Sequence, residues 1–438
     1  MIQSLSKKSY SKRQIQSSWI FVDVGNSAFA TTVLAAVFPQ YLPSLLPPQG
    51  ITIDLGFLSW KTSAISIWGY AVSLSIGLTL VLSLLIGQWA DYRGYRKRML
   101  GIFTAFGAMA TILLGFTGDW LWALGFFVIA NIGFSGSNVF YNALLAEVAP
   151  DSEWDNLSLK AVAWGYISGG LILALNLIMI MKHDWFGLSS AASGTRASFV
   201  VVGIWWMLWT FPSLVRIKES ANLRSKVRLG LSSLKSIWIS LRSMVYYPMA
   251  LIFLISFALY NDGISTTISM AAIIGKEALQ LGSETVIGTL LLIQFLGWPL
   301  TGLMIGITKW TGAKKLLSLS LMIWLGIIFY ASMMETALDF WVLGAAVAVV
   351  LGVSQALSRS IFTRLIPEGR QSEYFSLYAL SGKFCSILGP LVFGLVRDMT
   401  GDVRWSILSL AAFFALGLIL LQFVSIDPTR PRSVDLKM

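Results

Sequence analysis

Residues 87–98 read Gly87-Gln88-Trp89-Ala90-Asp91-Tyr92-Arg93-Gly94-Tyr95-Arg96-Lys97-Arg98 and form a short polar turn between two long apolar runs. The run before the turn covers about 62–87, and the run after it covers about 99–117. Glycine permits a tight turn, and four of the twelve residues are Arg or Lys. Each apolar run is long enough for a helix across a bilayer, so the pattern indicates a polytopic membrane protein.

The whole chain shares this apolar character. Of its 438 residues, 56% are hydrophobic and only 12% are charged, and the mean hydropathy is +0.73. A soluble domain carries about a quarter charged residues. A helix that crosses the bilayer core needs roughly 20 apolar residues. Twelve such spans are predicted, at 19–43, 62–87, 99–117, 120–147, 158–181, 198–217, 246–271, 285–307, 315–333, 339–362, 372–396 and 404–424.

The longest polar interruption divides these spans into six plus six. This arrangement is the hydropathy signature of two helical bundles related by an axis along the membrane normal, with the solute bound between them. The expected fold class is therefore an all-α polytopic membrane protein with two six-helix bundles. The predicted parts are a cytoplasmic N-terminal tail at 1–18, a bundle at 19–217, a basic cytoplasmic linker at 218–245, a bundle at 246–424 and a cytoplasmic tail at 425–438.

The positive charges predict the orientation. Of the 32 Lys and Arg residues, 25 lie on the side assigned as inner, most of them in the tails, linker and turns, and that side is expected to be cytoplasmic. The net charge of +11 comes mostly from these short segments and not from one basic domain, so no nucleic-acid partner is expected. The expected location is the cell (inner) membrane, with an organelle membrane as the alternative.

The opening turn resembles the signature loop of the major facilitator superfamily, Gly-x-x-x-Asp-x-x-Gly-x-Arg-Lys/Arg. The resemblance implies a transporter in which Gly87, Asp91, Gly94 and Arg96 form a conformational latch at the inner face. Asp91 could accept charge-assisted hydrogen bonds from a nearby Arg or a helix N-terminus. The alternative is an ordinary cytoplasmic turn.

Longer stretches are similar to the vacuole-effluxer-like branch of that superfamily, which includes autophagy-related vacuolar amino-acid effluxers. This resemblance covers nearly the whole chain and implies a major facilitator fold. For the studied fungal members it also implies export of neutral amino acids from the vacuole. One departure is Val24-Gly25, where the family usually has Trp-Ala. The stretches that carry the resemblance are 23–32, 140–145, 260–263, 355–360, 382–384 and 389–391.

Polar side chains recur at helical spacing in four of the predicted spans. A polar stripe in hydrocarbon is costly, so it should face water or another helix. In major facilitator proteins spans one, four, seven and ten line the cavity, and these are the spans with stripes. The alternative for any single Asn, Ser or Thr is a contact that joins helices. The stripes contain Asp23, Asn26, Ser27 and Thr31; Asn131, Ser135, Asn138 and Asn142; Asp262, Ser265, Thr266 and Ser269; and Gln355, Ser358 and Arg359.

Asp23, Asp262, Arg359 and Lys383 are charged residues within predicted spans, where an unpaired charge costs roughly 2.5–3.5 kcal/mol or more. Asp23 and Arg359 are expected near the inner face, while Asp262 and Lys383 lie deepest. Asp262 and Lys383 are expected to pair or to bind solute, with a structural bridge as the alternative. The predicted substrate-binding residues are Asp23, Asn26, Asn138, Asn142, Asn261, Asp262, Gln355, Arg359 and Lys383.

Charges of both signs suit a zwitterionic amino acid, whereas an organic anion could use the cations alone. Catalysis, cofactors and metals are not expected, because the single His183 lies in a loop and no metal-ligand spacing or ATP-binding loop is found. Transport would then be secondary, with possible proton or ion coupling through a carboxylate such as Asp262. The competing hypotheses are an intramembrane transferase that uses Asp262 and Lys383 as acid and base, and a transporter-like receptor without turnover.

Overall fold

The computed structural model describes residues 10–47, 51–54, 59–62, 94–218, 242–278, 281, 283–368, 370–384, 388–400 and 402–426, with scattered residues between 71 and 90. The first half contains α1 (Lys12–Ala28), the π-helix η2 (Phe29–Val37), α2 (Phe38–Leu45), β1 (Ile51–Asp54), β2 (Ser59–Thr62), α4 (Arg96–Leu114), α5 (Trp120–Ala143), α6 (Leu145–Val148), η3 (Asp151–Glu153), α7 (Trp154–Met181), η4 (His183–Phe186) and α8 (Ala191–Arg216). The second half contains η5 (Met244–Tyr246), α10 (Pro248–Ala278), α11 (Ser283–Thr311), α12 (Ala313–Ser332), α13 (Ala337–Leu365), α14 (Gln371–Phe384), α15 (Leu388–Thr400), α16 (Val403–Ser409) and α17 (Ala411–Phe423).

Polar residues define where several of the long helices begin. The Asp119 carboxylate accepts from the backbone N–H groups of Leu121 and Trp122 at the start of α5. Ser190 and Thr336 are the N-cap residues of α8 and α13, and each forms a capping box with the third residue of its helix. These caps satisfy N–H groups that the first helical turn leaves without a partner. The helices therefore start in polar turns and continue as apolar segments.

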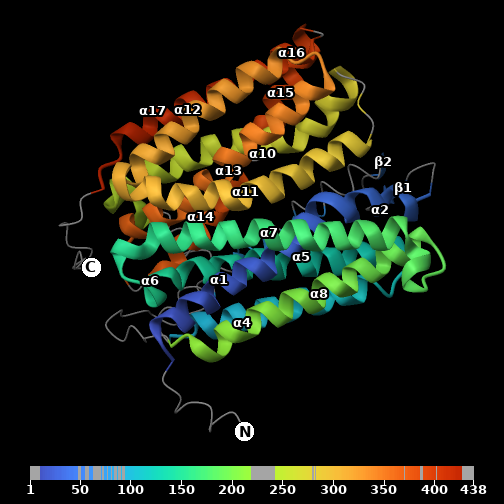
Figure 1. The fold of residues 1–438 in the computed structure, drawn as a ribbon, viewed down its shortest axis with the longest axis horizontal. Coiled ribbons are helices and arrows are strands. Elements are labelled where there is room, and N and C mark those ends of the chain that lie inside the picture. Colours follow the sequence, from blue (N-terminus) through green and yellow to red (C-terminus); the bar gives the residue numbers. More distant parts are fainter. Residues whose placement is uncertain are drawn as a thin grey trace.

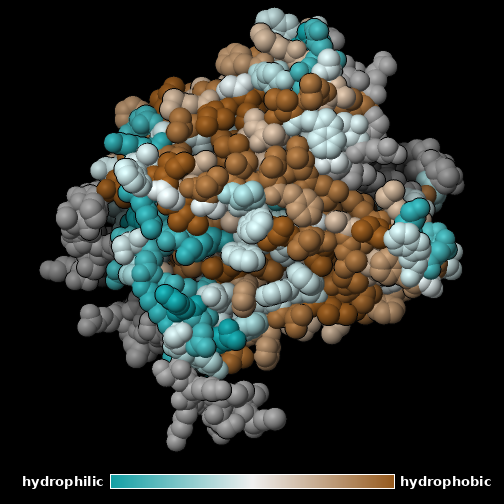
Figure 2. Space-filling model, in the orientation of Figure 1, coloured by the Kyte–Doolittle hydropathy of each residue, from teal (hydrophilic) through white to brown (hydrophobic). Residues whose placement is uncertain are grey.

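The outer surface of the long helices is apolar. Phe106, Leu208 and Leu303 expose 67%, 64% and 65% of their surface, although each lies inside a helix. Figure 2 shows hydrophobic residues over the middle of the visible face and hydrophilic ones toward its ends. Ten helices of the described residues are long and apolar enough to cross a membrane. Such an apolar band is expected on a protein whose helices are surrounded by lipid.

Figure 1 shows the two halves of the chain as two groups of helices, with α1 to α8 in one group and α10 to α17 in the other. Helix α7 lies between them and packs closely against both. A Cβ atom on Gly165 would lie 2.6 Å from Oγ of Ser27 in α1, and one on Gly170 would lie 3.1 Å from Cβ of Gln294 in α11. Small residues on α7 thus allow close contact with α1 in its own half and with α11 in the other half.

The all-helical membrane fold predicted from the sequence is confirmed, with two additions. Residues 51–54 and 59–62 form two antiparallel strands, in which Ile51 pairs with Thr62 and Asp54 with Ser59, and the sequence did not predict them. The middle of the first span is a π-helix, a form often found at functional sites. Most of the predicted span 62–87 and residues 385–387 of the span 372–396 lie outside the described residues, and the described part of the latter span belongs to α14 and α15. These two spans are the difference between the twelve predicted and the ten found.

Candidate functional site

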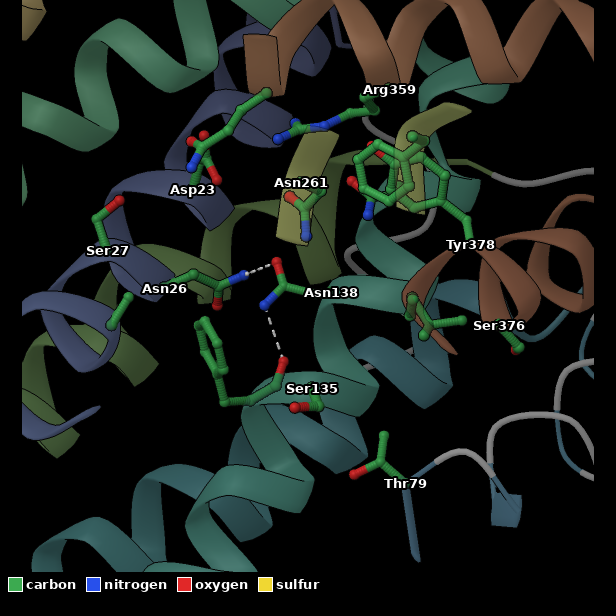
Figure 3. A pocket seen from close by; sticks show the side chains of 17 residues that line it. Asp23, Asn26, Ser27, Thr79, Ser135, Asn138, Asn261, Arg359, Ser376 and Tyr378 are labelled. Carbon is green, nitrogen blue, oxygen red and sulfur yellow. Dashed lines mark hydrogen bonds between the residues drawn. The ribbon is translucent and has the colours of Figure 1, made fainter. Parts of the chain in front are cut away.

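A cavity of about 400 Å³ lies between the two halves of the chain. Helices α1 and α5 of the first half and α10, α13 and α14 of the second half supply most of its walls (Figure 3). Seven of the nine residues predicted to bind solute line it: Asp23, Asn26, Asn138, Asn142, Asn261, Gln355 and Arg359. The four helices with polar stripes therefore meet at one site.

Arg359 of α13 is held by an aromatic pair from the other half. Its Nη1 donates to the Tyr141 hydroxyl at 2.9 Å, and its Cζ lies 4.9 Å from the Tyr141 ring centroid and 5.5 Å from that of Trp19. Trp19 and Tyr141 stack at 4.4 Å, and the Trp19 indole donates to the Tyr141 carbonyl at 2.9 Å. A cation over an aromatic face is attracted by the ring quadrupole, so this pair fixes the guanidinium at the cavity.

The guanidinium of Arg359 points toward Asp23 of α1 (Figure 3). The two groups do not form an ion pair, and Asp23 makes no hydrogen bond with any described residue. A buried charge normally has a partner. The cavity thus offers one carboxylate and one guanidinium whose charges do not cancel through direct contact, and both can contact a bound solute.

Two of the cavity amides are bound to the protein itself. The Asn26 amide donates to Oδ1 of Asn138 at 3.1 Å and accepts from the Trp206 indole at 2.6 Å. The Asn138 amide donates to the Phe134 carbonyl at 2.9 Å. These bonds join α1 to α5 and α8. Both amides therefore match the alternative expected for a polar residue in a span, which is a contact that joins helices. Asn26 and Asn138 therefore shape the wall, and they have little hydrogen-bonding capacity left for a solute.

The other three cavity amides have free polar atoms. Oδ1 of Asn142 is buried and has no partner among the described residues. The Asn261 amide donates to the Gly382 carbonyl at 3.0 Å, which leaves its oxygen. Gln355 is exposed within the centre of α13 and forms no hydrogen bond with any described residue. These groups can donate to or accept from a polar solute.

Asp262 does not line the cavity. It is fully buried, and its carboxylate accepts from the Gly389 backbone N–H at 2.8 Å and from the Thr266 hydroxyl at 3.3 Å. Gly389 is the second residue of α15, so the carboxylate lies at a helix N-terminus, where negative charge is stabilised. The side chain of Lys383 lies outside the described residues, and its pairing with Asp262 stays a prediction.

Part of the predicted latch connects the two halves. Arg96 donates to Glu147 at 2.7 Å within the first half and to Oε1 of Gln371 in α14 at 2.8 Å. Gly94 has a φ of 65°, a conformation that glycine adopts without strain. Gly87 and Asp91 lie outside the described residues, and their role stays a prediction.

A second connection at the same end was missed by the sequence analysis. Arg364 of α13 donates through Nε to Asp151 and through Nη1 to Asp155, both at 2.7 Å, and Ser360 donates to Asp155 at 2.5 Å. The residues Arg96, Gln371, Arg364, Asp151 and Asp155 together are called the inner closure below. From the sequence, Arg364 is only one of the positive charges that predict the orientation, because no spacing links it to acids more than 200 residues away.

Two helical halves that span a membrane and enclose a polar cavity define a membrane transporter of the major facilitator superfamily. Solved structures have the same fold. The human organic anion transporter MFSD10 aligns with a TM-score of 0.71 at 14% identity, over 94% of this chain and all of that chain. FucP in its outward conformation aligns with a TM-score of 0.72 at 12% identity, over 94% and 98%.

The chain belongs to the family described as vacuole effluxer Atg22 like, which matches residues 11–154 and 146–433. It is 30% identical to the uncharacterized MFS-type transporter YxiO of Bacillus subtilis, over 93% of this chain and 94% of that one. It is 26% identical to autophagy-related protein 22 of Kluyveromyces lactis, over 93% and 92%. The predicted superfamily and branch are thereby confirmed.

Proposed function

We propose that the protein is a secondary carrier that moves small zwitterionic solutes, with amino acids as the main class, by alternating access. The observation that carries the proposal is the cavity in which Asp23 and Arg359 face each other without an ion pair. An α-carboxylate matches the planar donor fork of a guanidinium, and an ammonium group matches a carboxylate. The chain's family is described as vacuole effluxer Atg22 like, and the resemblance to autophagy-related amino-acid effluxers implies the same class of solute.

The inner closure supports the alternating-access part of the proposal. Its bonds cross between the halves at one end of the cavity, so they hold that end shut in this conformation. Rocking of one half against the other would break them, open this end of the cavity and close the opposite end. The gradient of a proton, an ion or a second solute would drive the cycle, and Asp23 is the cavity carboxylate that could carry a proton.

Counterflow in proteoliposomes tests the function. Vesicles loaded with an unlabelled neutral amino acid should accumulate the labelled form, whereas Asp23→Asn vesicles should not. A matched control is Ser27→Ala, which changes a cavity neighbour without changing charge. Solute binding without counterflow would instead identify a receptor without turnover.

An organic-anion carrier is the second candidate, because Arg359 is held at the cavity independently of Asp23. In that case a labelled monocarboxylate without an ammonium group should exchange as fast as an amino acid. Asp23→Asn should then leave its transport unchanged or increase it. The response to Asp23→Asn therefore separates the two solute classes.

A further inference from the structure

A second cavity, of about 680 Å³, lies outside the transport site between the first turns of α1 and the start of α7. It is at the end of the molecule that carries the inner closure, which is the end predicted to be cytoplasmic. Its polar lining includes Lys12, Arg13, Glu153 and Lys160. This surface contains three cations and one carboxylate, and nothing in the transport proposal uses it.

The one carboxylate in this cavity, that of Glu153, already has partners within the protein. Glu153 forms an ion pair with Lys12 and accepts from the Gln16 amide at 2.6 Å. Arg13 and Lys160 are both exposed, and neither forms a hydrogen bond or ion pair with any described residue. The hydrogen bond from Lys12 lowers the pKa of Glu153 and the charge of Lys160 lowers it too, so Lys160 shares this one carboxylate with Lys12. Three cations against one carboxylate leave the cavity with a net positive charge, so it favours an anionic ligand.

The cavity continues into an apolar surface. Trp164 lines it and exposes 51% of its surface, and farther along α7 Leu171 and Ile178 expose 53% and 44%. These three residues are seven positions apart and share one face of the helix. The Trp164 ring lies 6.3 Å from that of Trp298 in α11, which is 42% exposed. A charged pocket thus opens onto an apolar stripe along the membrane-spanning part of α7.

We propose that this pocket binds the headgroup of an anionic phospholipid. The phosphodiester would contact Arg13 and Lys160, and an acyl chain would follow the α7 stripe. Oδ1 of Asn156, a further lining residue, is buried and has no partner among the described residues. It is an acceptor, so a headgroup with a hydroxyl, such as that of phosphatidylglycerol, supplies the donor that it lacks.

The apolar stripe favours a lipid over free phosphate, although both carry the same anionic group. Basic pockets between membrane helices on the cytoplasmic side are a known form of lipid recognition. A cation near the membrane surface contributes about 1 kcal/mol to such binding, so loss of two cations corresponds to roughly 30-fold weaker binding. The inference concerns binding and does not depend on which solute is transported.

The test uses the full-length protein in detergent, with retained lipid counted by native mass spectrometry. Wild-type protein should retain phosphatidylglycerol in preference to phosphatidylcholine of the same acyl chains. Arg13→Gln/Lys160→Gln should bind phosphatidylglycerol roughly 30-fold more weakly. Lys309→Gln/Lys315→Gln is the matched control, because it removes two exposed charges at the same end of the other half, and it should bind as the wild type does.

Two results would overturn the proposal. The first is an equal loss in both double variants, which would assign retention to overall surface charge. The second is displacement of the lipid by millimolar inorganic phosphate, which would make a free anion the ligand. A further variant examines the headgroup: Asn156→Leu should weaken phosphatidylglycerol binding several-fold and leave binding of phosphatidylmethanol, a phosphodiester without a hydroxyl, unchanged. Equal losses for both lipids would exclude the hydroxyl contact.

Discussion

The central cavity and the inner closure use the same kinds of side chain in opposite ways. In the closure, Arg364 contacts two carboxylates at 2.7 Å, and each of its charged neighbours comes from the other half of the chain. In the cavity, Arg359 and Asp23 also come from different halves and face each other, but they form no ion pair. The Arg359 guanidinium instead lies over the aromatic rings of Trp19 and Tyr141.

This difference separates holding a conformation from binding a solute. Charges that satisfy one another lower the free energy of the conformer in which they meet and have little left for a ligand. Charges that are positioned but not mutually neutralised stay available to a solute of complementary charge. We therefore expect closure variants to change the conformational equilibrium and cavity variants to change binding.

The largest effect is expected from the cavity guanidinium. Arg359→Gln should lower transport by about 100-fold, because truncation of a partly buried, hydrogen-bonded charge that contacts ligand costs several kcal/mol. Arg359→Lys keeps the charge and loses the planar fork, so it should retain a part of the activity. Initial transport rates and solute affinity should be measured on the same preparations. Wild-type affinity in Arg359→Gln would contradict this expectation, because the cavity charge would then not bind solute.

A smaller effect is expected when the closure loses its ion pairs. Arg364→Gln should favour the conformer that is open at this end by roughly 10-fold, since partly buried charge pairs contribute on the order of 1–2 kcal/mol. The measurement is labelling of a Ser376→Cys reporter in the cavity by a thiol reagent from the predicted cytoplasmic side, with Cys385, the one native cysteine, replaced. Labelling should become faster, while solute affinity changes little.

Arg370→Gln is the control for this experiment. Arg370 pairs at 2.6 Å with Glu373 of its own half, so its loss removes an ion pair at the same end without affecting the contact between halves. Its labelling rate should equal that of the parent. Equal acceleration in both variants would show that the labelling reports local loosening and not opening of the cavity.

The sequence predicted the fold well, because membrane helices can be recognised from their length and hydropathy. The predicted spans 120–147 and 315–333 agree with the structure within a few residues, and polar stripes identified the helices around the cavity. The contacts that give each polar residue its role were beyond the sequence. Asn26 and Gln355 look alike as polar residues in a span, yet Asn26 binds Trp206 and Asn138 while Gln355 is free within the described part of the chain.

The aromatic residues around Arg359 were missed for a related reason. Trp19 and Tyr141 are more than 100 positions apart, and aromatic residues are frequent in any membrane helix. Only the packing of α1 against α5 brings them under one guanidinium. The same holds for Asp262, which the sequence marked as a deep charge and which the fold places at the N-terminus of α15.

The second connection of the closure should contribute less than Arg364. Gln371→Ala removes the bond between Arg96 and the other half but leaves the pair with Glu147 intact. A hydrogen bond to a charged group contributes about 1.5 kcal/mol, and water can replace part of it, so roughly 3- to 5-fold faster reporter labelling is expected. No change at all would restrict the closure to Arg364 and its two carboxylates.

The smallest effect is expected from Gln355, and it separates the two regions most cleanly. The side chain is exposed to the cavity and bonds to no described residue, so Gln355→Ala should leave the melting temperature and the reporter labelling unchanged. Only the bound solute would lose a hydrogen bond, and one neutral, solvent-exposed bond of about 0.5 kcal/mol corresponds to a roughly 2-fold rise in KM. A lower melting temperature would mean that Gln355 supports the helices. A change in maximal rate at constant KM would place it among the residues that control the conformational cycle.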